Sequence, residues 1–524
     1  MSDMRLWNLT YEPLDRACRY YRKKVAIIDG DRQLTYSELG EFTNRVANGL
    51  IALGVRPGEV IGMLMPNCLE FIPTQHGLWK AGAVMVQMPA RASAGDQIHF
   101  LNSADATTLI YHAEFDDVVE QLRKQCPAVR RYIRLAPTAT PSADIDYAAA
   151  FDAQSAQAPR VPVRPEDLAS IAFTSGSTGA PKAVRNSHES TVHMHIPAGS
   201  EIGDVRAGEV FALGAPLTHF AQIFVLPTFL KGGTVVMLHG LDVDLIFDAV
   251  ERYRVTATAL VPTVLYMMLA HPRRNSVDLS SLRTIVYAGS PMAPDRLREA
   301  VTAFGQVFSQ TYAGTEPTFM TCLTKEDHDI SNPATAHRLG SAGRAMSHVT
   351  LSVQDEQDNI LASGEIGEIC SRQAGQMVGY VDSTRDHETI RDGWVHTGDI
   401  GYIDDDGYVF IVDRKKDMVV TGGFNVFPRQ IEDVLLQHPA VAQCAVIGVP
   451  DEKWGEAVKA IVVQAATQSA TADELIALVK EHKGSVWAPK TVKFVDSLPL
   501  TTTGKIDKKN LKAPYWADQD RLVH

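Results

Sequence analysis

The stretch that decides the fold runs from Ile171 to Val184 and reads IAFTSGSTGAPKAV. A short apolar run ends at Phe173 and gives way to hydroxyl-bearing residues and glycines, which is typical of a strand that ends in a tight loop. Gly176 and Gly179 let the backbone turn sharply and approach a ligand closely. The polar side chains of the loop are Thr174, Ser175, Ser177, Thr178 and Lys182. Backbone amides, hydroxyls and one ammonium suit a polyphosphate, so this stretch predicts a nucleotide-binding loop.

The spacing of this loop differs from that of the common P-loop. That motif places Lys directly after its second glycine and Ser or Thr after the Lys, whereas here two residues separate Gly179 from Lys182 and Ala183 follows. The Gly-x-Gly-x-x-Gly pattern of dinucleotide-binding proteins is also missing from the loop. The alternative interpretation is an exposed Ser/Gly linker, but a linker has no need of the Pro181-Lys182 pair that comes immediately after it.

Length and composition describe an ordinary globular protein with more than one domain. The 524 residues exceed what one core usually organises, and 45% are hydrophobic and 21% charged. The net charge of −12 argues against nonspecific binding to nucleic acids or anionic membranes. No run of about 18 apolar residues predicts a membrane span, and the N-terminus lacks the order of a signal peptide. The six cysteines lack metal-ligand spacing, so we expect a cytoplasmic protein without disulfides or structural zinc.

Periodicity and capping residues predict alternating helices and strands in the first half of the chain. Thr35 and Glu38 can form a capping box at the start of a helix that ends near Gly54. A buried strand over 60–65, a helix that includes 76–81 and a strand over 84–86 follow. This alternation is typical of parallel α/β layers, and a second α/β stretch follows the Gly/Ser loop.

The second half of the chain has a different pattern. From about Arg344 the sequence predicts alternating strands, two of them joined in a hairpin by the turn at 404–407. A compact α+β unit then follows, with a helix from Pro428, strands over 445–449 and 460–463, and a last helix capped by Thr471 with Glu474.

Four further polar segments stand out along the chain. The segment 310–316 follows a strand and ends in the carboxylate of Glu316, and the segment 394–399 places Asp399 after a glycine turn. Arg414 closes the predicted hairpin. A second hydroxyl-rich loop, Thr-Thr-Thr-Gly-Lys, ends at Lys505. Each segment alone is a weak signal, but their joint order is specific.

Together these segments resemble the adenylate-forming superfamily of acyl-CoA synthetases, nonribosomal adenylation domains and luciferases. The motifs TYSEL, TSGSTGAPK, YAGTE, TGD, DRKKD and TGKI occur in the order of that family and cover almost the whole chain. The resemblance implies an α/β fold. A large N-terminal domain over 1–413 would hold two layered α/β subdomains and a small β-barrel-like subdomain. A hinge at 414–416 and a small, mobile α+β lid domain over 417–524 would follow.

The resemblance implies an acyl-CoA synthetase with ATP, Mg²⁺ and CoA. A carboxylic acid attacks the α-phosphate of ATP and releases pyrophosphate, and a thiol then takes the acyl group from the acyl-adenylate. By this resemblance the catalytic residues are Lys505, Thr315 and Glu316, and Glu316 also binds the metal. The nucleotide site comprises Thr174, Ser175, Gly176, Ser177, Thr178, Gly179, Lys182, Gly289, Ser290, Thr311, Tyr312, Ala313, Asp399 and Arg414. Asp399 accepts the ribose hydroxyls, Tyr312 lies near the adenine, and Lys505 bridges the attacking carboxylate and the ribose-phosphate oxygens.

Further residues carry over from the family to the acyl and thiol sites. Lys416 matches the hinge around which the small domain reorients, so that Lys505 leaves before a thiol enters. The acyl pocket would be lined by His219, Ala288, Gly289 and Met320, and the CoA tunnel by Gly422, Gly423, Trp454 and Lys490.

Three departures from the family pattern bear on the substrates. Ala313 stands where glycine is usual, and we expect its methyl group either to narrow the space beside the acyl carbon or to shift the loop slightly. Trp487 or Ala488 occupies the place of a basic residue that meets CoA phosphate in many ligases. The residues therefore support adenylate formation more strongly than they support thioester formation with CoA. Ala215-Pro216 stands where adenylation domains carry an Asp for an amino group, so we expect a fatty, aryl or alicyclic acid without an α-amine.

Two other functions remain open from the sequence. A stand-alone adenylating enzyme would pass its acyl-AMP to a carrier protein or partner enzyme in trans. A nucleotide-binding protein without turnover is disfavoured, because Lys505, Glu316 and Asp399 are all present. The sequence leaves open whether the protein is a monomer or a dimer.

Overall fold

The computed structural model describes residues 8–136, 143–174, 181–290, 292–451, 453–465, 468–499 and 506–516. The chain divides into two compact units. The first comprises Met1–Leu351 and Ser371–Val395, and the second comprises Ser352–Cys370 and His396–His524. The boundary predicted at residues 413–417 falls inside the second unit, and the hinge there stays a prediction.

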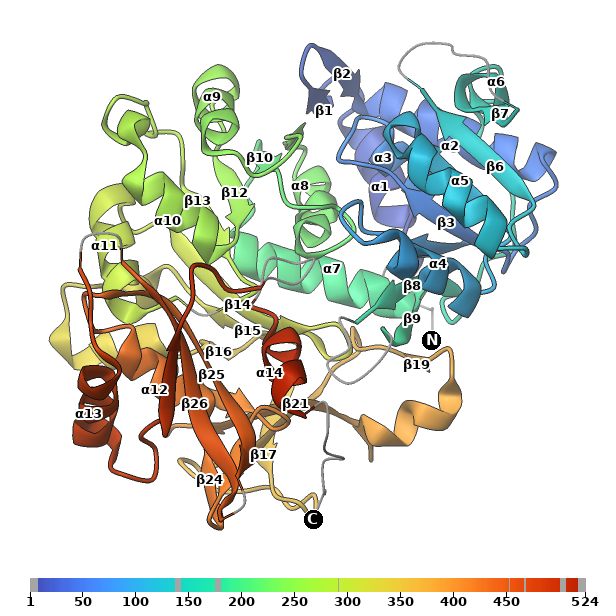
Figure 1. Cartoon of the computed structure of the whole chain (residues 1–524). Coiled ribbons are helices and arrows are strands. Elements are labelled where there is room, and N and C mark those ends of the chain that lie inside the picture. Colours follow the sequence, from blue (N-terminus) through green and yellow to red (C-terminus); the bar gives the residue numbers. More distant parts are fainter. Residues whose placement is uncertain are drawn as a thin grey trace. The chain divides into compact units, whose positions relative to one another are not determined.

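A nine-stranded sheet forms one half of the first unit (Figure 1). Its strands, in spatial order, are β16 (Arg344–Ala345), β15 (Thr318–Leu323), β14 (Phe308–Gly314), β13 (Thr284–Tyr287), β12 (Ala257–Leu260), β10 (Val210–Leu213), β11 (Thr234–Met237), β1 (Val25–Asp29) and β2 (Arg32–Thr35). The strands from β14 to β1 are parallel, and the edge strands β2, β15 and β16 are antiparallel. Every residue of β12 and β13 is buried, as parallel strands covered on both faces require.

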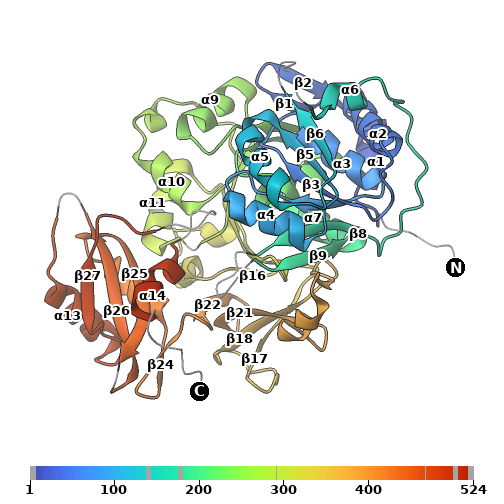
Figure 2. The same ribbon diagram turned by 45° about the vertical axis from the view of Figure 1, so that its right-hand side comes forward.

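An eight-stranded sheet forms the other half of the first unit. Its strands are β19 (Gly379–Tyr380), β9 (Ala183–Ser187), β8 (Leu168–Phe173), β4 (Val84–Gln87), β3 (Val60–Leu64), β5 (Thr108–His112), β6 (Arg131–Leu135) and β7 (Ile145–Asp146). The strands from β8 to β7 are parallel, whereas β9 and β19 add antiparallel pairs at one edge, where Figure 2 shows β8 and β9 side by side. The predicted parallel α/β layers are confirmed.

Helices cover these two sheets. They are α1 (Glu12–Tyr20), α2 (Tyr36–Ala52), α3 (Phe71–Lys80), α4 (Ala94–Ser103), α5 (Asp116–Gln125), α6 (Tyr147–Phe151), α7 (His188–Gly203), α8 (Val225–Leu230), α9 (Val243–Tyr253), α10 (Pro262–Ala270) and α11 (Pro294–Phe304). Short 3₁₀ turns are η1 (Ala113–Phe115), η2 (Phe220–Phe224), η3 (Pro272–Asn275), η4 (Glu326–His328), η5 (Pro333–Gly340) and η6 (Ser383–Glu388). The capping box predicted at Thr35 and Glu38 begins α2.

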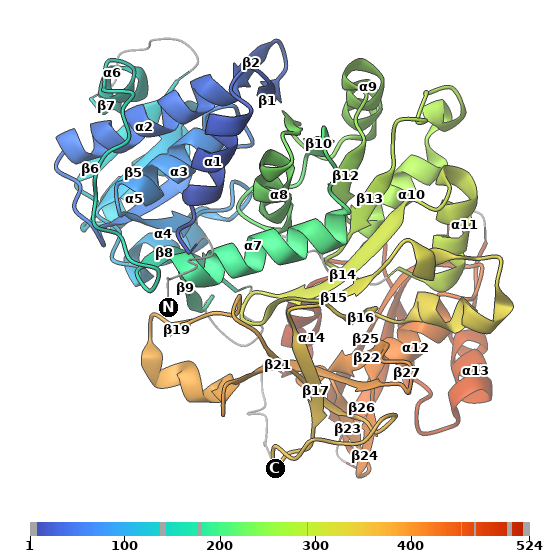
Figure 3. The same ribbon diagram turned by 180° about the vertical axis from the view of Figure 1, so that it is seen from behind.

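Helix α7 joins the two sheets. It contacts β8 and β9 of the eight-stranded sheet and β13, β14 and β15 of the nine-stranded sheet. Figure 3 shows it as one long helix between them. Because α7 packs against both sheets, it holds them, and the loops at the ends of their strands, in fixed positions relative to each other.

Two five-stranded sheets follow. The first contains β17 (Thr350–Gln354), β18 (Gly367–Arg372), β21 (Trp394–Ile403), β20 (Ile390–Arg391) and β22 (Val409–Arg414). The second, wholly in the second unit, contains β24 (Phe424–Val426), β23 (Val419–Thr421), β26 (Gly455–Gln464), β25 (Val441–Asp451) and β27 (Thr491–Phe494), with helices α12 (Pro428–Leu435), α13 (Ala472–Lys483) and α14 (Lys508–Trp516). The hairpin at 404–407, the helix at Pro428 and the cap at Thr471 are confirmed.

Two predictions about this half of the chain are wrong. The helix capped by Thr471 is not the last, because α14 follows it. The Nε1 of Trp516 in α14 donates to the Gly448 carbonyl of β25 at 3.2 Å, so a tertiary contact stabilises a segment whose Pro514 weakens local helix propensity. The segment at Asp399 is not a turn either, since Gly398 adopts φ 71° inside the ten-residue strand β21.

Within the described ranges, no helix combines the length and apolar character that a membrane crossing requires.

Candidate active site

The predicted phosphate loop begins where β8 ends. The Thr174 N–H donates to the Lys182 carbonyl at 3.0 Å, and the Lys182 N–H donates to the Thr174 hydroxyl at 3.3 Å. These two hydrogen bonds join the two ends of the loop, as expected for a loop that connects the antiparallel strands β8 and β9. Ser175, Gly176, Ser177, Thr178 and Gly179 lie outside the described residues.

The Lys182 ammonium is held by two neighbours from a distant part of the chain. It lies 3.0 Å from Glu388 Oε2 and 4.9 Å from the centre of the Tyr380 ring. The ion pair with Lys182, followed by that with Arg385, lowers the pKa of the Glu388 carboxyl. The loop lysine therefore already has an anionic partner that a phosphate could replace.

The carboxyl ends of β13 and β14 bring the next predicted residues together. Tyr287 pairs with Gln310, so Ala288 and the exposed Gly289 and Ser290 emerge beside Thr311. The Thr311 hydroxyl is buried and has no hydrogen-bond partner among the described residues. An unpaired buried hydroxyl is costly, so its presence is consistent with a polar ligand.

Glu316 lies in the tight turn between β14 and β15. Tyr312, Ala313, Gly314 and Thr315 lead into this turn, all at least partly exposed. Thr318 adopts φ 61°, a left-handed conformation that is costly for a β-branched residue. Hydrogen bonds from three residues of the segment 373–380 stabilise the turn. The Gln373 amide donates to the carbonyls of Pro317 and Phe319, the Met377 N–H donates to the Glu316 carbonyl, and the Tyr380 hydroxyl donates to Glu316 Oε1 at 3.0 Å.

The donor set at Glu316 fits a hard divalent cation. One oxygen of this half-buried carboxylate accepts from Tyr380, and no other described residue donates a hydrogen bond to the second oxygen. The Thr315 hydroxyl belongs to the preceding residue. Mg²⁺ prefers one or two carboxylates together with phosphate oxygens. The residues present are therefore compatible with a magnesium ion.

The predicted acyl-site residues come from three segments. His219 is exposed and contacts its neighbour Thr218, whereas Met320 is buried and is the extra residue of β15 at the register shift between β14 and β15. The rings of Phe220 and Phe319 have their centres 6.2 Å apart, which brings the segments of His219 and Met320 together. Ala288 is buried and directly follows β13, the strand that pairs with β14.

The second unit holds the predicted ribose site. Asp399 of β21 is buried and pairs with Arg414 of β22, whose Nε lies 3.0 Å from Asp399 Oδ1. Lys416 follows, half-buried, and burial, with the charge of Arg414, lowers its pKa. Lys505 lies outside the described residues.

Glu368 braces the backbone beside Asp399. Its buried carboxylate accepts the Gly398 N–H at 3.0 Å and lies 3.1 Å from Lys415 Nζ and 3.4 Å from His396 Nδ1. The Gly398 carbonyl in turn accepts the Lys415 N–H at 2.9 Å. Both peptide groups of Gly398 are thus fixed, one by Glu368 and one by the chain next to Lys416.

Three of the four predicted tunnel residues gather at the β23–β24 turn. Gly422 and Gly423 adopt φ 58° and 81°, and the Gly422 N–H donates to the Trp454 carbonyl at 2.9 Å. A Cβ on Gly422 would lie 2.7 Å from the Trp454 ring, so this side chain covers the glycine. Lys490 is exposed just before β27, and its N–H donates to Val458 of β26.

Sequence reasoning missed four residues of this arrangement: Tyr380, Glu388, Gln373 and Glu368. Each acts through a contact with a distant segment, and none belongs to a motif with its own spacing. For Tyr380 and Glu388 the sequence offered no signal; for Glu368 the signal was its place in a buried strand, where an unpaired carboxylate is rare.

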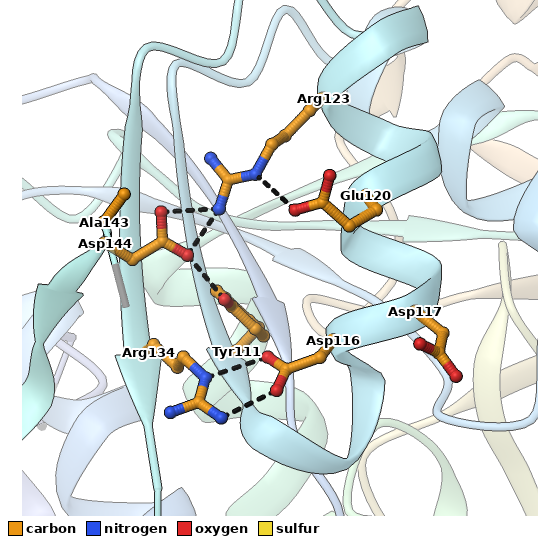
Figure 4. A pocket seen from close by; sticks show the side chains of 8 residues that line it. All are labelled: Tyr111, Asp116, Asp117, Glu120, Arg123, Arg134, Ala143 and Asp144. Atoms are coloured by element: carbon orange, nitrogen blue, oxygen red, sulfur yellow. Dashed lines mark hydrogen bonds and ion pairs between the residues drawn. The ribbon is translucent and has the colours of Figure 1, made fainter. Parts of the chain in front are cut away.

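A separate pocket of about 400 Å³ lies on the flank of the eight-stranded sheet (Figure 4). It contains none of the predicted site residues. Figure 4 shows its two arginines engaged with carboxylates, Arg134 with Asp116 and Arg123 with Asp144 and Glu120. Its cations are already neutralised, so it is not the candidate site.

Comparison with known proteins gives matches over almost the whole chain. The model of the AMP-binding enzyme family matches residues 14–381, and that of the AMP-binding enzyme C-terminal domain matches residues 430–505. The medium/long-chain-fatty-acid–CoA ligase FadD8 of Mycobacterium tuberculosis is 37% identical over 97% of this chain and 90% of its own length. Feruloyl-CoA synthase of Amycolatopsis sp. is 36% identical over 98% of this chain and all of its own. The structure of the amide bond synthetase McbA from Marinactinospora thermotolerans has a TM-score of 0.86 at 30% identity, over 95% of this chain and 98% of that one.

Proposed function

The chain belongs to the AMP-binding enzyme family of adenylate-forming ligases, and we propose that it is an AMP-forming acid–thiol ligase that uses CoA. It activates a carboxylic acid as an acyl-adenylate, releases pyrophosphate, and transfers the acyl group to CoA. Its relatives FadD8 and feruloyl-CoA synthase suggest fatty and hydroxycinnamic acids as the first candidates.

One observation carries this proposal: Lys182 and Glu316 contact the same side chain, Tyr380. The cation of one motif and the carboxylate of another, far apart in sequence, thus belong to one local arrangement. A triphosphate with its metal needs both, because phosphate oxygens attract an ammonium and a carboxylate holds the metal.

The roles of the other residues follow the family. Residues 174–182 would hold the β- and γ-phosphates, Thr315 would hydrogen-bond the α-phosphate, and Glu316 would hold Mg²⁺, whose charge would offset that of the phosphate oxygens. The Thr311 hydroxyl, for which the described residues supply no hydrogen-bond partner, and the backbone of 288–290 and 312–313 would line the nucleotide.

The carboxylate of Asp399 can accept two ribose hydroxyls, and Arg414, whose Nε lies 3.0 Å from that carboxylate, would contact the ribose. Lys505 offsets the charge that develops when the acid attacks the α-phosphate. The turn of Gly422 and Gly423 gives the thiol its route, after a rearrangement at Lys416 that gates the second step.

Mass spectrometry tests the proposal directly. The protein is mixed with ATP, Mg²⁺, CoA and a panel of fatty, hydroxycinnamic, aryl and alicyclic acids, and acyl-AMP and acyl-CoA are read from the same sample. We expect both for at least one acid. Acyl-AMP without acyl-CoA would contradict the use of CoA and direct the search to a carrier protein or an amine acceptor; neither product from any acid would contradict the ligase.

Lys505→Ala tests the assigned catalytic lysine. We expect acyl-AMP formation to fall at least about a hundredfold while ATP binding changes little, because the lysine acts on the transition state. Lys509→Ala, which removes an exposed lysine of α14, is the matched control. Undiminished adenylation by the Lys505 variant would refute its role.

A further inference from the structure

Tyr380 is a buried residue outside every motif that identified the family. It forms β19 together with Gly379, and this two-residue strand pairs with β9 directly after the phosphate loop, Tyr380 opposite Val184. Only 2% of the residue is exposed. A buried tyrosine normally needs a partner for its hydroxyl, and Tyr380 has two.

The direction of the Tyr380 hydroxyl is determined by its partners. Its oxygen lies 3.0 Å from Glu316 Oε1 and 3.0 Å from the Thr389 hydroxyl. An ionised carboxylate can only accept, so the single phenolic hydrogen points to Glu316, and Thr389 must donate to the phenolic oxygen. This chain of two hydrogen bonds fixes one oxygen of Glu316 and leaves the other available to a metal.

The ring of the same side chain supports the loop lysine. Lys182 Nζ lies over it, 4.9 Å from its centre, within the range of a cation–π contact. The other neighbour of the ammonium, Glu388, is 45% exposed at its side chain. The carboxylate can therefore swing away when a phosphate arrives, whereas the buried ring stays in place.

Backbone contacts hold Tyr380 rigidly enough for both tasks. The Asp386 carboxylate accepts the Tyr380 N–H at 2.7 Å, and the neighbouring Val381 N–H donates to Ala183 of β9 at 2.9 Å. The Met377 N–H donates to the Glu316 carbonyl at 3.0 Å. Glu316 is thus held through both its backbone and its carboxylate by the segment that carries Tyr380.

We propose that Tyr380 is a positioning residue that fixes the metal-binding carboxylate of Glu316 and the phosphate-binding ammonium of Lys182 relative to each other. Its hydroxyl acts on the metal side and its ring on the phosphate side, so nucleotide and metal bind to a preformed pair. This inference rests on the proposed function, because it assigns Glu316 to the metal and Lys182 to the phosphates.

Two substitutions separate the two contacts. Tyr380→Phe keeps the ring and removes the hydroxyl, and Tyr380→Leu removes both. Binding of ATP is measured by calorimetry, without an acid substrate, over a range of Mg²⁺ concentrations. We expect Tyr380→Phe to raise the half-saturating Mg²⁺ concentration about tenfold and to leave metal-free ATP binding unchanged, because a hydrogen bond to a charged group is lost. We expect Tyr380→Leu to weaken metal-free ATP binding about threefold as well.

The matched control is Tyr36→Phe. Tyr36 is also buried, and its hydroxyl donates to the Gly233 carbonyl at 2.6 Å in another part of the first unit. Its loss should leave both binding curves unchanged. If Tyr380→Phe does not fold, Thr389→Val replaces it; this variant leaves the tyrosine whole but frees its hydroxyl, and we expect about a threefold rise in the Mg²⁺ requirement.

The outcomes separate this inference from the proposed function. An unchanged Mg²⁺ dependence in the folded Phe variant, or in Thr389→Val, overturns the inference even if the wild type makes acyl-AMP. A wild type that binds ATP with Mg²⁺ and shows the expected shifts in its variants, but activates no acid, supports the inference and refutes the ligase.

Discussion

The Glu368 carboxylate offers a prediction whose size follows from the structure. Burial alone would raise its pKa, but the hydrogen bond to His396 and the charge of Lys415 reverse this effect and lower the pKa from 4.5 to about 2. At about 1.36 kcal/mol for each pH unit, this difference corresponds to about 3 kcal/mol of stability in the ionised state. The Glu368 side chain is only 8% exposed, but that of its partner Lys415 is 48% exposed, so solvent screening makes about 3 kcal/mol an upper value.

The substitution Glu368→Gln keeps the shape and an acceptor for Gly398 but removes the charge. Because the pKa of the folded state is depressed, the stabilisation is present above about pH 4.5 and is lost as the pH falls towards about 2. We therefore expect the variant to be less stable than the wild type by up to about 3 kcal/mol near pH 6, and this difference to shrink steadily below pH 4.5.

Urea titrations of both proteins between pH 6 and pH 3 measure this difference. The exposed Glu356 of the same unit supplies the control, since Glu356→Gln should change stability by less than about 0.5 kcal/mol at every pH. A difference for Glu368→Gln that is the same at pH 6 and pH 3 would refute the argument, because it would then come from packing rather than from the charge.

Two further contacts, one near the proposed thiol site and one near the proposed phosphate site, can be tested by substitution. Gly422→Ala should destabilise the protein by about 2 kcal/mol in urea titrations, because it adds a contact of 2.7 Å with the Trp454 ring to the strain of φ 58°. Gly423→Ala is the control: its Cβ meets no described atom within 4 Å, so this variant should lose only about 1 kcal/mol. Equal losses of stability in the two variants would contradict the role of Trp454. Glu388→Gln should tighten ATP binding about threefold in calorimetry at low salt, because the exposed carboxylate of Glu388 no longer competes with phosphate for Lys182. Unchanged or weaker ATP binding would show that the Glu388 carboxylate does not compete.

Local rules explain which parts of the fold the sequence predicted. The capping box of Thr35 and Glu38 and the 404–407 hairpin turn depend on residues within a few positions of one another, and both are present in the structure. The end of β8 at Phe173, before the Gly/Ser loop, follows from the same kind of signal. Helix α14 escaped prediction because its stability comes from contacts with β25, which no local pattern encodes.

In the candidate site, too, local sequence patterns revealed some residues, whereas residues that act through distant contacts were missed. Lys182 was found from the composition of the Gly/Ser loop and Glu316 because a family motif contains it, but nothing in the sequence indicated that one tyrosine from a two-residue strand would contact both. Such a contact depends on the pairing of β19 with β9, residues that lie almost two hundred positions apart. Gly398 was misread as part of a turn because a positive φ, which glycine permits, occurs here inside a strand that Glu368 braces.

The pairing of β1 with β11 has a consequence for how the protein folds during its synthesis on the ribosome. Ile27 to Asp29 pair with Val235 to Met237, so the first hairpin has no sheet to join until about two hundred further residues have been made. At about 5–20 residues per second, this delay is about 10–40 s. During that time the edge of β1 is open to unintended partners, and the nascent chain is a natural client for chaperones that bind early apolar segments.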